Sequence, residues 1–251
     1  MYKIEARQAS EDFAKCWRAA GTHLQKQVQG GISWLKADLV PPILEHLSFR
    51  LGNQAFYVRI EDLAGRLEVP ASRQGLMHVA NGCNGHACLM PMKKRVTDGQ
   101  WVPDCAGWGL IDATTGSSID PLALVSDEKI EITEWELHDF AVQVVRDQLR
   151  KEGYEIMSAQ GHPNADPSIW FVGDSNRPEW VVVRAVRYPE SDAERPRHWA
   201  GIAASCAELS KIGHFASVAF VSTDNSYDPG RGVTPLWRGH GVHVRYAGLE
   251  K

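Results

Sequence analysis

The stretch from Asp166 to Tyr188 constrains the fold most, because no other part of the chain is as dense in β-branched and aromatic residues. It predicts two strands, over residues 168–172 and 180–188, joined by the polar turn 173–178. Arg184 lies in the middle of the second strand, which is otherwise apolar enough to be central in a sheet. A charge at such a position must be paired or must face a functional cavity.

Composition narrows the class of protein. The 251 residues allow one large domain or two small ones. The net charge of -4 argues against a broadly basic nucleic-acid-binding surface, although it does not exclude a local basic groove. There is no apolar run of the roughly 20 residues that a membrane span needs, and the N-terminus lacks the apolar core of a signal peptide. We therefore expect a cytoplasmic protein without a membrane partner.

Residues 1–125 predict an α+β region with two helices and a small, mostly antiparallel sheet. Ser10 can cap a first helix that runs to about Val28, because serine accepts a hydrogen bond from the first turn. A second helix is expected to begin at Pro41-Pro42 and to continue through Phe49, since proline suits a first turn. Two glycine turns predict hairpins, at Asp98-Gly99 and at Thr115-Gly116.

Residues 126–251 hold the clearest helix of the chain, which is capped by Thr133 and Glu136 and ends in the sequence LRKEGYEI. Two strands follow it, and Asp166 stands at the start of the second. The order is completed by the strand WVVVRAVRY, a helix over 198–211, a strand over 215–222 and a last strand over 239–246. The sequence thus predicts a helix, three strands, a helix, a strand and one further strand.

Over residues 133–246 this order resembles the common core of the PD-(D/E)XK superfamily, whose fold is the restriction-endonuclease-like α-β-β-β-α-β core with a mixed sheet. The resemblance implies that an Asp of the second strand and an acid-x-Lys pair of the third hold Mg²⁺ or Mn²⁺, which activates water for phosphodiester cleavage. Asp166 matches the first position. Arg184 stands where the Lys is expected, and Val182 stands where the acid is expected.

These two departures indicate a degraded metal site, because valine cannot ligate a metal and arginine does not give up its proton. We therefore expect a non-catalytic protein of nuclease-like fold that binds a macromolecule, either nucleic acid or a partner protein. A purely protein-binding role, as in an immunity or assembly protein, fits the mild acidity. In a third hypothesis the protein is a metal-dependent nuclease in which Asp166 acts with Glu208 or Glu136.

Each of these candidates also has a structural interpretation. Glu136 completes a capping box, Glu208 is solvated, and Asp166 caps the turn before Pro167. Arg184 pairs with Asp166 inside the core. The neighbours of Asp166 and Arg184 in space, whether a metal, a cavity or each other, discriminate between the interpretations.

A group of zinc-compatible residues lies in the first region, where Cys83, His86 and Cys88 stand close together and Cys105 follows. Glycines beside them would help to wrap a knuckle, so a structural Zn²⁺ site is one interpretation. Buried thiols beside exposed histidines explain the same pattern without a metal, and a nucleophilic cysteine activated by His86 is a third interpretation. The five cysteines are odd in number and scattered, which does not fit a disulfide framework.

The C-terminal run from Pro235 to Tyr246 interleaves aromatic and basic side chains. Single-stranded nucleic acids are held by stacking on aromatic rings and by basic grooves, so this run is a candidate nucleic-acid-binding segment. Its candidate residues are Trp237, Arg238, His240, His243 and Arg245. An edge strand with alternating polar and apolar residues produces the same pattern without a ligand.

Overall fold

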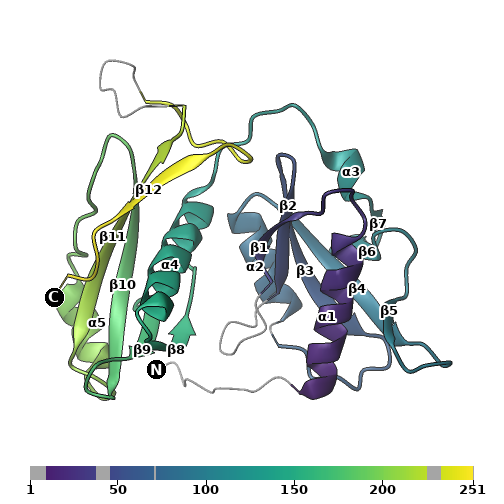
Figure 1. Cartoon of the computed structure of the whole chain (residues 1–251), viewed down its shortest axis with the longest axis horizontal. Coiled ribbons are helices and arrows are strands. Elements are labelled where there is room, and N and C mark those ends of the chain that lie inside the picture. Colours follow the sequence, from purple (N-terminus) through teal and green to yellow (C-terminus); the bar gives the residue numbers. More distant parts are fainter. Residues whose placement is uncertain (1–9, 38–45, 71, 225–232, 251) are drawn as a thin grey trace. The chain divides into compact units, whose positions relative to one another are not determined.

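The computed structural model describes residues 10–37, 46–70, 72–224 and 233–250. The chain divides into two compact units, Gln8–Ile130 and Glu131–Lys251, and each unit has its own mixed sheet (Figure 1). The protein is therefore a mixed α+β protein, as the sequence predicts. The second unit begins a few residues after the predicted boundary at residue 125. Among the described residues, none of the helices has the length and apolar character to span a membrane.

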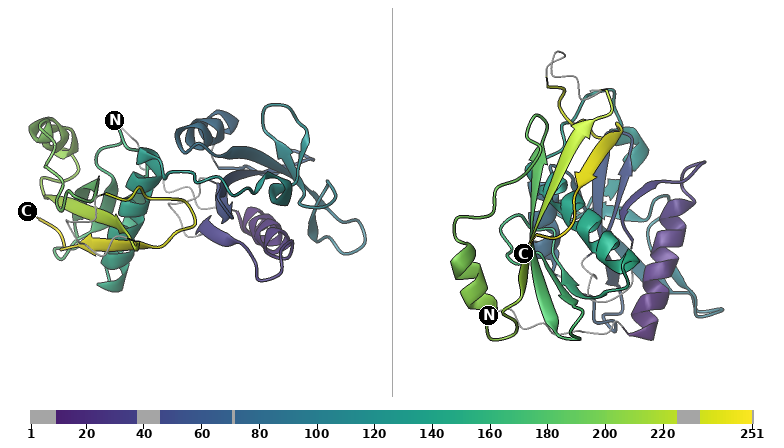
Figure 2. Two further views of the ribbon diagram at one scale, coloured as in Figure 1. Left: turned by 90° about the horizontal axis from the view of Figure 1, so that it is seen from above. Right: turned by 60° about the vertical axis from the view of Figure 1, so that its left-hand side comes forward.

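The two longer helices of the N-terminal unit lie on opposite faces of one sheet (Figure 2). Its helices are α1 (Glu11–Gln25), α2 (Arg73–Gly82) and the short α3 (Pro121–Leu124). Its strands in spatial order are β1 (Ser33–Lys36), β2 (Leu47–Leu51), β3 (Gln54–Asp62), β4 (His86–Lys94), β6 (Leu110–Asp112) and β7 (Ser118–Ile119), and β5 (Trp101–Pro103) pairs with β4. Both predicted hairpins are confirmed, because β5 pairs with β4 and β7 pairs with β6 in antiparallel register.

The first predicted helix is confirmed, and the second is wrong over its described residues. Ser10 caps α1, where its Oγ accepts a hydrogen bond from the Phe13 N–H at 3.1 Å. Pro41-Pro42 lie outside the described residues, but Leu47–Leu51 form strand β2, because alternate side chains there face the core. The sequence does not predict α2, which contains the poor helix formers Gly75, Asn81 and Gly82.

The C-terminal unit has the predicted order of elements. They are α4 (Glu134–Lys151), β8 (Glu155–Ala159), β9 (Ile169–Val172), β10 (Pro178–Arg187), α5 (Trp199–Cys206), β11 (Gly213–Ser222) and β12 (Val242–Tyr246). The strands lie side by side in the order β12-β11-β10-β9-β8. β10 and β11 are parallel, and the other pairs of described strands are antiparallel.

Helices α4 and α5 cover opposite faces of this sheet (Figure 1). Val181 and Val183 of β10 pack in the core beneath α4, whereas Trp180 and Val182 pack beneath α5. Successive side chains of a strand point to opposite faces. The side chain of Arg184, which follows Val183, therefore projects from the α5 face of β10, the central strand.

Candidate functional site

Asp166 and Arg184 bind each other. Arg184 donates from Nη1 to Asp166 Oδ1 at 2.9 Å and from Nη2 to Oδ2 at 2.5 Å. Nη1 also donates to the Val183 carbonyl at 2.8 Å. The side chain of Arg184 is 23% exposed and that of Asp166 is 12% exposed. One guanidinium thus engages both oxygens of the carboxylate, in the forked geometry that makes arginine pairs strong and directional.

Ser168 explains why these two residues meet. Its N–H donates to the Val181 carbonyl at 2.9 Å, and its Oγ accepts from the Val183 N–H at 3.2 Å. These bonds hold the start of β9 against the middle of β10. Asp166 lies two residues before Ser168 and Arg184 one residue after Val183, so the same junction brings the two charges together.

His198 lies beside the Asp166–Arg184 pair, and the charges of the pair act on a second histidine, His138. His198, at the N-terminus of α5, is 69% exposed and has its Nε2 3.5 Å from Asp166 Oδ2. His138, on α4, is 5% exposed, and its Nε2 has no hydrogen-bond partner in the described part of the chain. Burial, and then the charge of Arg184, lower the pKa of His138 to about 4. Its imidazole is therefore neutral at neutral pH.

The pattern of the sequence does not single out His138 as part of the site. The available signal is its spacing, because His138 lies four residues before Val142 on the buried face of α4. A histidine at that spacing is buried, and a buried imidazole near an expected site is a candidate for function.

Glu136 and Arg238, which the sequence assigns to two different sites, form a second ion pair. Arg238 donates from Nε to Glu136 Oε1 at 2.8 Å and from Nη2 to Oε2 at 3.0 Å. The two side chains are only 2% exposed for Arg238 and 4% for Glu136. Glu136 also accepts from the Thr133 N–H at 2.9 Å, which completes the predicted capping box. Glu136 and Arg238 are thus buried and bind each other, and Glu136 also caps α4.

Clusters of three or more His, Cys, Asp or Glu side chains that could hold a metal ion are absent from the described residues. Val182 is fully buried beneath α5, and Glu208 is exposed in the turn after that helix. Asp166 and Glu136 are moreover each paired with an arginine.

The predicted zinc ligands also do not form a metal-binding group within the described ranges. Cys83 is the C-cap of α2, and Cys88 is buried in β4, where burial raises the pKa of its thiol. His86 is half-buried, with its Nε2 3.0 Å from Gln54 Oε1. Cys105 lies in the bend after β5. The interpretation as buried thiols fits Cys83 and Cys88, but His86 is not the exposed histidine that this interpretation expects.

The C-terminal basic run is divided between the interior and the edge of the sheet. Trp237 is half-buried, and Arg238 is buried in its ion pair. His240 is exposed in the turn before β12. His243 and Arg245 are exposed on β12 itself. The five residues therefore do not form one continuous basic and aromatic surface.

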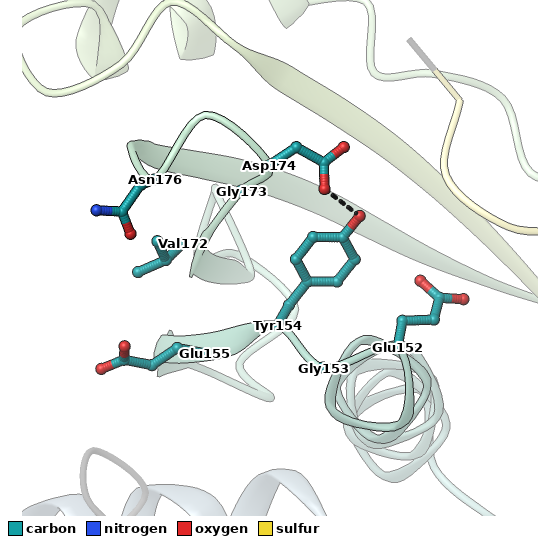
Figure 3. Close-up of a pocket in the computed structure, with 8 residues that line it drawn as sticks. All are labelled: Glu152, Gly153, Tyr154, Glu155, Val172, Gly173, Asp174 and Asn176. Carbon is teal, nitrogen blue, oxygen red and sulfur yellow. Dashed lines mark hydrogen bonds between the residues drawn. The ribbon is translucent and has the colours of Figure 1, made fainter.

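A separate pocket of about 400 Å³ opens where α4 ends and β8 begins (Figure 3). Tyr154 stands in it and donates from its hydroxyl to Asp174 Oδ1 at 2.9 Å. The hydrogen bond to Asp174 and the nearby carboxylates raise the pKa of Tyr154. Glu152 and Glu155 also line this pocket, which contains none of the residues that the sequence predicts to be functional.

Residues 135–251 match the family model described as Domain of unknown function (DUF8840). The match begins within α4 and covers less than half of the chain. No curated protein and no solved structure matches the chain. The matched residues coincide with the unit that holds the Asp166–Arg184 pair.

Proposed function

We propose that the C-terminal unit is a restriction-endonuclease-like core that does not cleave phosphodiesters and that binds a partner protein. The order of its elements and the parallel pairing of β10 with β11 in a mixed sheet support this core. Likeness of fold is weak support for a function, which must be argued from the site.

The observation that carries the proposal is the ion pair between Asp166 and Arg184. The guanidinium of Arg184 lies against both oxygens of Asp166, and its positive charge repels a metal cation from that carboxylate. Val182 offers no ligand where an acid is expected, and Arg184 keeps its proton at any working pH. The residues of the site thus favour binding over catalysis.

The charges of the C-terminal unit favour a protein over nucleic acid as the partner. Residues 131–251 hold 13 Lys and Arg against 17 Asp and Glu, so the net charge of -4 falls entirely in this unit. Arg184, Arg187 and Arg238 pair with carboxylates. Nucleic-acid binding depends on basic side chains that neutralise phosphates, and these three, together with Arg146, which pairs with Asp147, are already neutralised within the protein.

Cleavage assays test the loss of activity. The full chain is incubated with single-stranded and double-stranded DNA and RNA in Mg²⁺ or Mn²⁺, beside Asp166→Ala and a matched control, Asp192→Ala, which changes an exposed aspartate of the loop before α5. We expect no metal-dependent cleavage by any of the three proteins. Cleavage by wild type and Asp192→Ala that disappears in Asp166→Ala would refute the proposal.

Binding of labelled oligonucleotides tests the choice of partner. Fluorescence anisotropy is measured at low and at physiological salt, for wild type and for Arg245→Glu. We expect weak binding that is similar for the two proteins. Tight binding that falls steeply with salt and weakens in Arg245→Glu would instead identify nucleic acid as the partner.

A further inference from the structure

The two edge strands of the C-terminal sheet, β8 and β12, differ in how readily a further strand can pair with them. β8 has a register irregularity between Ile156 and Ser158, and such a bulge twists an edge away from a neighbouring strand. β12 pairs with β11 in unbroken register from Val242 to Tyr246 and contains no proline. In the described ranges, β12 is therefore the edge whose geometry suits the addition of another strand (Figure 1).

β12 also exposes side chains on both of its faces. Three successive residues, His243, Val244 and Arg245, are exposed, and Val244 is 44% exposed. Successive side chains point to opposite faces, so the middle of the strand reaches solvent on each side, while Val242 and Tyr246 at its ends pack against the core beneath α4. The strands β8, β9, β10 and β11 have at most one exposed residue each.

The register of β12 separates its side chains by chemistry. Val244 lies opposite Phe220, a core residue beneath α4, so Val244 points to the α4 face. His243 and Arg245 are its neighbours along the strand and point to the α5 face. A strand that pairs with β12 thus meets two basic side chains on one face and an apolar side chain on the other.

We propose that the outer edge of β12 binds an extended segment of a partner protein by strand addition, and that this segment carries carboxylates at alternate positions. In this mode main-chain hydrogen bonds supply affinity, and side chains at alternate positions supply specificity. An acid–apolar–acid pattern places carboxylates beside His243 and Arg245, and the positive charge of Arg245 attracts a carboxylate on a neighbouring strand. The inference rests on the proposed protein-binding function and names the chemistry of the partner.

Synthetic peptides test this inference. The probes are three labelled peptides with the cores Glu-Val-Glu-Val-Glu, Lys-Val-Lys-Val-Lys and Glu-Pro-Glu-Pro-Glu, in identical solubilising flanks. The proline peptide keeps the charge of the first but lacks two backbone N–H donors. We expect the full chain to bind the first peptide roughly tenfold more tightly than either of the others. Only the first peptide can supply both the main-chain hydrogen bonds along β12 and the carboxylates.

Two charge reversals complete the experiment. Arg245→Glu changes the proposed edge, and Arg177→Glu makes the same change in charge at an exposed arginine in the turn between β9 and β10. We expect Arg245→Glu to bind the glutamate–valine peptide more weakly and the lysine peptide more tightly than wild type does. Arg177→Glu should bind all three peptides with wild-type affinity.

Three outcomes of the peptide experiments overturn the inference at β12. They are equal binding of the glutamate–valine and glutamate–proline peptides, no effect of Arg245→Glu, and no binding of any peptide. Competition by a single-stranded oligonucleotide that depends on Arg245 also overturns it, because the edge is then a nucleic-acid surface. The cleavage assays are independent of these results, so failure at β12 is distinguishable from failure of the proposed loss of catalysis.

Discussion

Two carboxylate–guanidinium pairs of the C-terminal unit share one geometry and differ in burial. In each pair an arginine donates hydrogen bonds to both oxygens of one carboxylate. Glu136 and Arg238 are almost fully buried, whereas Asp166 and Arg184 are partly exposed. A charge left alone in the first pair has no water to solvate it, so that pair is structural. The second pair reaches water, and changes there alter the surface without the same loss of stability.

Arg238→Met gives the largest effect that this comparison predicts, because it leaves the charge of Glu136 buried and unpaired. Breaking a buried ion pair costs about 3–5 kcal/mol, and we expect the free energy of unfolding to fall by that amount. Urea unfolding followed by tryptophan fluorescence measures it. The double variant Glu136→Gln/Arg238→Met should recover part of the loss, since both charges are then gone. A loss below about 1 kcal/mol in the single variant would mean that this pair contributes no more to stability than an exposed ion pair does.

His138 makes the region around Asp166 and Arg184 sensitive to pH. The pKa of His138 is about 4 in the folded chain, against an ordinary value of 6.5. Between these values only the unfolded chain takes up the proton, so the free energy of unfolding falls as the pH drops through this window. The loss is complete below the folded pKa and amounts to about 3 kcal/mol. Urea unfolding at a series of pH values measures the slope.

Two variants attribute that slope to His138. His138→Leu removes the titrating group, and we expect it to flatten the dependence between pH 6.5 and the folded pKa of about 4. His243→Asn, at an exposed position of β12, is the matched control and should keep the wild-type slope. An unchanged slope in His138→Leu would assign the pH dependence to another group.

The parts of the C-terminal unit that follow from sequence have local signals. The capping box at Thr133 predicts α4, and the run of β-branched residues predicts β10. The pairing of Asp166 with Arg184 is one of the interpretations that the sequence supports, because these residues stand on neighbouring predicted strands. Arg238, in contrast, lies 102 residues from Glu136 along the chain, and no local pattern connects them.

Two elements of the N-terminal unit differ from the prediction, the strand Leu47–Leu51 and the helix α2, and both differences have a related cause. Leu47–Leu51 is short enough for its apolar residues to suit one face of a helix as well as one face of a strand. Its pairing with β3 decides in favour of the strand, and that pairing is a tertiary interaction. α2 is stabilised by packing on β3 and β4, which overcomes its weak intrinsic propensity.

Asp166→Asn should have a smaller effect than Arg238→Met. It removes the charge that Arg184 pairs with but leaves a side chain that can still accept one hydrogen bond. Hydrogen bonds between charged groups contribute about 1.5–3 kcal/mol, and partial access to water places the expected loss at the lower end. Asp192→Asn is the matched control and should change the free energy of unfolding by no more than about 0.5 kcal/mol. A loss as large as that of Arg238→Met would show that burial does not separate the two pairs.

Arg187 extends the comparison to an exposed partner and carries the smallest expected effect. Its Nε donates to Glu134 Oε1 at 2.9 Å, and Glu134 is 79% exposed. Exposed pairs contribute about 0.2–1 kcal/mol, and salt screens them. A double-mutant cycle with Glu134→Gln and Arg187→Met isolates this coupling from the hydrogen bond that Arg187 also makes to the Ile132 carbonyl. We expect a coupling energy in that range that shrinks at high salt, whereas a salt-independent coupling as large as that between Glu136 and Arg238 would contradict the ranking by burial.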